Sequence, residues 1–211
     1  MTPQPPGLRM VRLLGTVSLL CGVLIVGTNL ATSGHIRHNQ EIIMRDSVAE
    51  LLPGIQKQII YGIEPSGELK IVAGIEFGGP RLFAGYDGAG KFLGVVIETS
   101  DRGYADVISA MYAYSIEKQA ITGFKVVDMR ETPGLGDRIR SDPEFEKNFE
   151  DLDATHPIKT VKHGTKKNPW EIDAISGATI SSRAVGRMLA KSVEDVTPVV
   201  LKNRERIERG N

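Results

Sequence analysis

An uncharged apolar run near the amino terminus, residues 13–31, most constrains how this chain can fold. Leu, Val, Ile, Gly, Ser and Thr dominate the run, and a helix of this length extends about 28 Å, close to the hydrocarbon thickness of a bilayer. Arg9 and Arg12 precede it on a short tail without acidic residues, which favours an amino terminus in the cytoplasm. The sequence therefore predicts one transmembrane helix, with the bulk of the chain outside the cytoplasm.

Two alternatives concern this amino-terminal segment. A cleaved signal peptide would need a small-x-small site, and residues 31–33 supply a poor one after an apolar run longer than most signal sequences carry. Lipidation of Cys21 would need a small residue before the cysteine, where Leu20 stands. We therefore favour a retained single-pass anchor in the inner (cell) membrane, in contact with lipid, with Cys21 as a buried thiol.

Composition and motifs exclude several classes of function. Lys and Arg number 26, as do Asp and Glu, so no global field attracts nucleic acid. The single cysteine excludes an internal disulfide, and the four histidines lack the spacing of a metal site. No P-loop and no Gly-x-Ser-x-Gly elbow is present. We expect no nucleic-acid partner, no metal and no catalytic residue.

The remaining pattern predicts an α+β domain with a mostly antiparallel sheet and flanking helices. Asp87-Gly-Ala-Gly90 is typical of a hairpin turn, and Pro53-Gly54 ends a helical apolar pattern. We expect strands at residues 58–63, 69–77, 82–86, 92–98, 107–114, 121–129 and 158–163, and helices at 142–152 and 182–196. The predicted organisation is a cytoplasmic tail (1–12), a transmembrane helix (13–32), a stalk helix (33–53), an extracytoplasmic domain (54–198) and a charged tail (199–211) that is mobile from Lys202.

One candidate ligand loop follows the predicted strand 121–129. The 131–136 loop reads Glu-Thr-Pro-Gly-Leu-Gly, in which proline fixes one φ angle and two glycines allow backbone shapes closed to other residues. The loop is either a tight turn or a surface that presses its backbone against a flat ring and offers donors to the ring's carbonyls. The spacing alone leaves both open.

The second candidate is the 173–179 segment, Asp-Ala-Ile-Ser-Gly-Ala-Thr, before the predicted helix 182–196. Small residues let a ligand approach the backbone, and a helix N-terminus offers free N–H groups and partial positive charge to a phosphate. The alternative is that Thr179 or Ser181 caps the helix and no ligand is needed.

Together, in this order and behind a membrane anchor, the two motifs resemble those of the FMN-binding G subunits of Rnf (Rsx) electron-transport complexes. The C subunit of the Na⁺-translocating NADH:quinone reductase is related. The resemblance implies that a flavin transferase moves FMN from FAD onto the Thr179 hydroxyl with loss of AMP, leaving a phosphoester. It implies that Ser176, Gly177 and Ala178 surround the phosphate, and that Asp173 belongs to the transferase recognition signal.

The resemblance also implies an electron-transfer subunit without independent catalysis, bound to other membrane subunits of an ion-translocating complex. Its candidate ring contacts are Glu131, Thr132, Gly134, Leu135 and Gly136, with Gly103, Tyr104 and Trp170 as weaker ones. Three alternatives remain open: the C subunit of the quinone reductase, an anchored flavoprotein feeding another extracytoplasmic respiratory chain, and a binding subunit without flavin.

Overall fold

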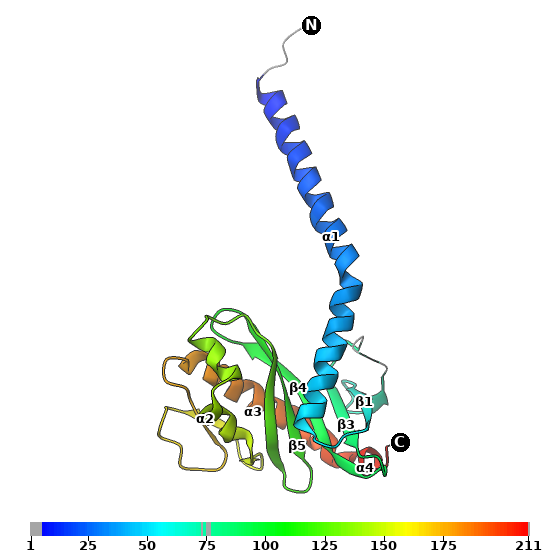
Figure 1. The fold of residues 1–211 in the computed structure, drawn as a ribbon, viewed down its shortest axis with the longest axis vertical. Coiled ribbons are helices and arrows are strands. Elements are labelled where there is room, and N and C mark those ends of the chain that lie inside the picture. Colours follow the sequence, from blue (N-terminus) through cyan, green and yellow to red (C-terminus); the bar gives the residue numbers. More distant parts are fainter. Residues whose placement is uncertain (1–5, 73, 75–76, 211) are drawn as a thin grey trace. The chain divides into compact units, whose positions relative to one another are not determined.

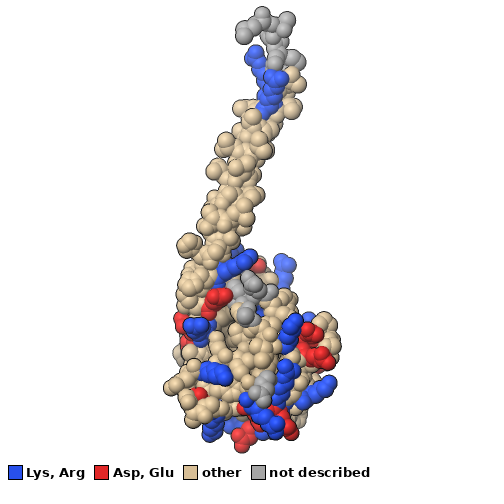
Figure 2. All heavy atoms as spheres, turned by 90° about the vertical axis from the view of Figure 1, so that its right-hand side faces the viewer, with Lys and Arg blue, Asp and Glu red and all other residues tan. Residues whose placement is uncertain are grey.

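The computed structural model describes residues 6–72, 74 and 77–210. They divide into two compact units between Ile42 and Ile43, and helix α1 (Pro6–Leu51) begins in the first and ends in the second (Figure 1). An 18-residue window of this helix has a mean hydropathy of 2.1 with no burial in protein, so α1 is long and apolar enough to cross a membrane. A long stretch without charged side chains is visible along it (Figure 2). The predicted transmembrane and stalk segments are therefore parts of one unbroken helix.

The second unit contains a seven-stranded antiparallel sheet, which confirms the predicted α+β class. A separate pair of short parallel strands lies before the last long helix. The order in the sheet is β2-β1-β3-β4-β5-β6-β7. The strands are β1 (Lys57–Ile63), β2 (Leu69–Ile71), β3 (Arg81–Tyr86), β4 (Phe92–Arg102), β5 (Val107–Ser115), β6 (Ala120–Asp128), β7 (Leu152–Asp153), and the parallel pair β8 (Lys159–Val161) and β9 (Glu171–Asp173).

Both faces of the sheet are covered. Helix α3 (Thr179–Lys202) packs on one face in the larger core cluster, and the last turns of α1 pack on the other. Neighbouring residues of β4 point to opposite faces of the sheet: Val95 belongs to the cluster under α3 and Val96 to the cluster under α1. A strand buried on both faces is apolar throughout, which explains why the sequence shows little clean alternation.

Glycines let the end of α1 approach the sheet closely. A Cβ added at Gly85 would lie 2.7 Å from Leu52 Cδ1, and one at Gly123 would lie 3.0 Å from Leu51 Cδ2. Side chains at these positions would push the helix away from the strands. The stalk thus ends as part of the domain core.

The carboxyl-terminal helices correct the prediction for this region. Helix α3 starts at Thr179, before the predicted 182, and continues through Pro198 to Lys202. A short helix α4 (Arg204–Arg209) follows, with Ile207 fully buried and its carbonyl accepting a hydrogen bond from the Tyr86 hydroxyl. The predicted mobile tail is therefore wrong. Burial of Val200 and Ile207 outweighs the local cost of a proline inside the helix.

The connection between β6 and β9 also differs from the prediction. A 3₁₀ turn η1 (Gly136–Arg140) is followed by α2 (Pro143–Glu146), capped by the Asp142 carboxylate, and by a second 3₁₀ turn η2 (Lys147–Phe149). The helix predicted at 142–152 therefore ends early and its last residue begins β7. The strand predicted at 158–163 shortens to β8, and that predicted at 69–77 ends at Ile71, with residues 73, 75 and 76 outside the described residues.

Candidate functional site

The two predicted ligand segments meet at one hollow of about 360 Å³. The 131–136 loop leaves β6 and the 173–179 segment leads into α3, so the fold brings them together from distant parts of the sequence. Ile180, which the sequence did not single out, and Ser181, considered there only as a helix cap, also border it. The lining consists of Tyr104, Glu131, Thr132, Leu135, Gly136, Gly177, Ala178, Thr179, Ile180 and Ser181.

The start of α3 leaves backbone donors free at this hollow. The N-cap residue is Ala178, and no described side chain caps the helix. The first amide of α3 to find a carbonyl is that of Ser182, which donates to Ala178 O at 2.9 Å, so the amides of residues 179–181 have no partner within the described chain. The alternative that Thr179 or Ser181 caps the helix is therefore wrong. Free amides at the positive end of a helix suit an anion.

The turn before α3 is held from inside the domain. The Ser182 hydroxyl donates to Ala178 O at 2.9 Å and accepts from the amide of Ile175 at 3.1 Å. Gly177 has a φ of 85°, a left-handed conformation that favours glycine. Ser176 is exposed, does not line the hollow, and its carbonyl accepts from Arg138 Nη1 at 3.3 Å. The turn is thus fixed by protein contacts that leave its outer side open.

The Glu131 carboxylate joins three segments of the site. Its Oε1 accepts from the amides of Tyr104 (2.9 Å) and Ala105 (3.1 Å), and its Oε2 accepts from the Ser181 hydroxyl (2.8 Å). Gly136 makes room for this junction, because a Cβ there would lie 2.7 Å from Ser181 Oγ and closer still to the carboxylate. The carboxylate predicted as a ring contact is therefore engaged by protein groups.

Asp173 does not line the hollow. It ends strand β9, beside the buried side chain of Asn148. Both of its carboxylate oxygens accept from the amide of Gly164, at 2.8 and 2.9 Å. Asn148 binds the Asp173 backbone on both sides, accepting from its amide at 2.9 Å and donating to its carbonyl at 3.3 Å. Lys166 also donates to Asn148 at 3.1 Å, and burial lowers the pKa of this lysine. Asn148 thus positions the strand that leads into the motif, a role that sequence spacing did not indicate.

The weaker predicted ring contacts lie differently. Tyr104 lines the hollow, whereas Gly103 lies beneath Glu131, where a Cβ would collide with the carboxylate. Trp170 does not line the hollow; its ring stacks on His156 with centroids 4.3 Å apart. Gly134 is exposed, has a φ of 75°, and also lies outside the lining.

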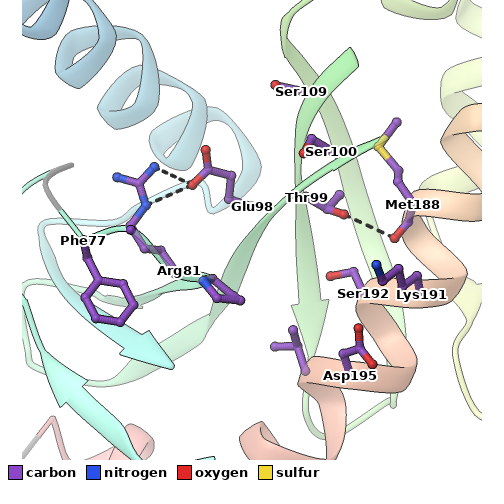
Figure 3. Close-up of a pocket in the computed structure, with 14 residues that line it drawn as sticks. Phe77, Arg81, Glu98, Thr99, Ser100, Ser109, Met188, Lys191, Ser192 and Asp195 are labelled. Atoms are coloured by element: carbon purple, nitrogen blue, oxygen red, sulfur yellow. Dashed lines mark hydrogen bonds and ion pairs between the residues drawn. The ribbon is translucent and has the colours of Figure 1, made fainter. Parts of the chain in front are cut away.

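A second hollow of about 430 Å³ lies between β4, the residues before β3 and the middle of α3 (Figure 3). Arg81 donates there to Glu98 through Nε (3.0 Å) and Nη2 (2.6 Å), and Thr99 donates to Met188 O at 3.2 Å. This hollow contains no residue of either motif. Met188 is the first α3 residue that it reaches, about 13 Å along the helix from Thr179, so the free amides of α3 are not available to it.

The first hollow also has an apolar rim. Tyr104 is 65% exposed, and Leu135 and Ile180 are each 51% exposed, although all three are large hydrophobic side chains. Apolar walls with a few directed polar groups are typical of small-molecule sites. Free helix amides on one side and an apolar rim on the other fit a ligand that joins a phosphate to a flat ring system, as FMN does.

Comparison with known proteins agrees with this chemistry. Residues 103–194 match the FMN-binding domain family, a range that includes both motifs. The chain is 31% identical over 186 residues to the G subunit of the ion-translocating oxidoreductase complex of Methanosarcina acetivorans, covering 86% of this chain and 89% of that protein. It is 29% identical over 189 residues to the G subunit of the Na⁺-translocating ferredoxin:NAD⁺ oxidoreductase complex of Acetobacterium woodii, with coverages of 86% and 87%.

The fold is also found in a solved structure. Shewanella oneidensis NqrC superposes with a TM-score of 0.67 at 18% identity, covering 80% of this chain and 99% of that one. This likeness supports the fold, and the identity to the Methanosarcina protein over most of both chains supports the family. The chain belongs to the G subunits of ion-translocating oxidoreductase (Rnf) complexes.

Proposed function

We propose that this chain carries FMN covalently, through a phosphoester to the Thr179 hydroxyl, and passes electrons between other subunits of an ion-translocating membrane complex. The observation that carries the proposal is the meeting of Thr179, the unpaired first-turn amides of α3 and the apolar rim at one hollow. A phosphate on the Thr179 oxygen would begin at the helix end that favours negative charge. FMN supplies one- and two-electron transfer when bound.

Different residues of the hollow would contact the phosphate and the ring of FMN. Gly177 leaves space where the phosphate would lie, since among the described atoms a Cβ there would have Leu135 Cδ2, at 3.7 Å, as its one neighbour within 4 Å. Leu135 and Ile180 offer apolar surface to the ring, and the exposed Thr132 hydroxyl offers a donor to its carbonyls. Since the linkage runs through the phosphate, burial and hydrogen-bond donors from the protein set the redox potential.

Attachment requires a dedicated enzyme in this proposal. A flavin transferase forms a bond from Thr179 Oγ to the FMN phosphorus of FAD and breaks the bond to the AMP phosphate; the hydroxyl proton passes to a base and AMP leaves. Asp173 belongs to the recognition signal. Its carboxylate is 26% exposed while it holds the Gly164 amide, so it remains partly accessible in the folded domain.

The proposed location follows from helix α1. Arg9 and Arg12 lie before the apolar stretch, which favours a cytoplasmic amino terminus and an FMN domain, residues 54–198, on the extracytoplasmic side of the inner membrane. The names of two relatives specify proton- and Na⁺-translocating ferredoxin:NAD⁺ oxidoreductases. We propose that the FMN of this subunit accepts and donates electrons on a path between carriers such as ferredoxin and NAD⁺. Alone, the subunit would convert no substrate.

The test is mass spectrometry of the full chain produced together with a flavin transferase. Wild-type protein is expected to gain the mass of FMN less one water, and Thr179→Ala is expected to gain nothing. Thr165→Ala is the matched control, because Thr165 is exposed on the loop between β8 and β9. A flavin mass on Thr179→Ala would contradict the attachment point, and an unmodified wild-type chain would contradict covalent attachment as a whole.

A further inference from the structure

The Glu131 carboxylate is a buried charged group in the wall of the proposed cofactor pocket. Its residue is only 9% exposed, yet it borders the same hollow as Thr179. Two backbone amides and the Ser181 hydroxyl donate to it. Three donors thus converge on its two oxygens, which are the acceptor atoms of a carboxylate.

No basic side chain among the described lining residues balances this charge. Among the described residues that line the hollow, Glu131 is the one charged side chain, and the others are apolar, hydroxyl-bearing or glycine. Its compensation comes from the dipoles of the Tyr104 and Ala105 amides and from the Ser181 hydroxyl. The pocket therefore holds a fixed negative charge next to the proposed ring position.

We propose that Glu131 lowers the midpoint potential of the flavin, in addition to joining the walls of its pocket. The inference rests on the proposed attachment of FMN to Thr179. Electrons added to the ring increase its negative charge, and a nearby buried carboxylate opposes that increase more strongly than an exposed one, because the effective dielectric is lower. With FMN attached at Thr179, the free amides of α3 would receive the phosphate, and Glu131 would border the same hollow as the ring.

The experiment compares midpoint potentials of the full flavinylated chain in detergent, measured by dithionite titration with mediator dyes. Glu131→Gln keeps the side-chain length: its oxygen can accept from Tyr104 and Ala105, and its amide can donate to Ser181. The expected result is a positive shift of the midpoint potential. Glu117→Gln removes the same charge from an exposed turn and is expected to leave the potential unchanged.

A second variant, Ser181→Ala, should shift the midpoint potential in the opposite direction. Ser181→Ala removes one donor from the carboxylate and leaves its charge less compensated, so its midpoint potential is expected to shift negative. It decides the question even if Glu131→Gln does not fold. Unchanged potentials in variants that carry the FMN mass would overturn this inference alone. A wild-type chain without FMN would overturn the proposed function and the inference together.

Discussion

The two ends of helix α3 differ in whether a side chain bonds to their free backbone groups. At the start, Ala178 provides no capping side chain and the first amides open into the hollow. At the end, Asn203 Nδ2 donates to Val199 O at 2.9 Å, and the short helix α4 follows with Ile207 buried. A missing N-cap costs about 1 kcal/mol. Packing along α3 therefore stabilises the helix although its first turn lacks a cap, and those free amides are the ones that we propose for a phosphate.

The largest effect is expected from Ile207→Ala, which should lower stability beyond the end of α3 without changing FMN attachment at its start. Ile207→Ala removes a fully buried side chain, so the free energy of unfolding should fall by about 2–5 kcal/mol. Folded protein should still gain the FMN mass, since Ile207 lies outside the hollow. Urea unfolding of the full chain in detergent measures the loss, and Ile71→Ala, at a 54% exposed position, is the control. Unchanged stability with lost FMN would contradict the comparison.

Local signals in the sequence predicted much of the sheet. The turn at Asp87 is confirmed, because its carboxylate accepts from the amides of Ala89 (2.9 Å) and Lys91 (2.8 Å) between β3 and β4. Such contacts join residues a few positions apart, so the local sequence is enough to predict them. The resemblance to the Rnf G subunits implied that the 131–136 loop and the start of the last long helix serve one ligand, and residues of both segments line one hollow.

The contacts that build the site were not predictable, because they join residues far apart in the chain. Glu131 and Ser181 are 50 positions apart, and Asn148 and Asp173 are 25 apart. The helix start was also misplaced, since Ala178 is a poor cap by local rules. Local rules are expected to fail where function leaves groups unsatisfied, and the uncapped start of α3 is where we propose such a function.

An intermediate effect is expected from giving α3 the cap that it lacks. Ala178→Ser supplies an oxygen that can accept from an amide of the first turn, so the chain without flavin should gain about 1 kcal/mol of stability. The same oxygen competes with a phosphate, so the fraction of chains carrying the FMN mass should fall. Ala89→Ser, in an exposed hairpin turn, should change neither quantity. Unchanged stability in Ala178→Ser would mean that these amides already have partners.

The smallest effect is expected at the other end of the helix. Asn203→Ala removes the side-chain donor to Val199 O, and a half-buried hydrogen bond of this kind contributes about 0.5–1.5 kcal/mol. Stability should fall slightly while FMN attachment stays complete, as measured by urea unfolding and mass spectrometry on the same samples. The sign is the sensitive quantity: adding a polar side chain should stabilise the start of α3, and deleting one should destabilise its end. If both variants moved stability in the same direction, the first turn of α3 would be as fully satisfied as the last, and its openness to a phosphate would lose its physical basis.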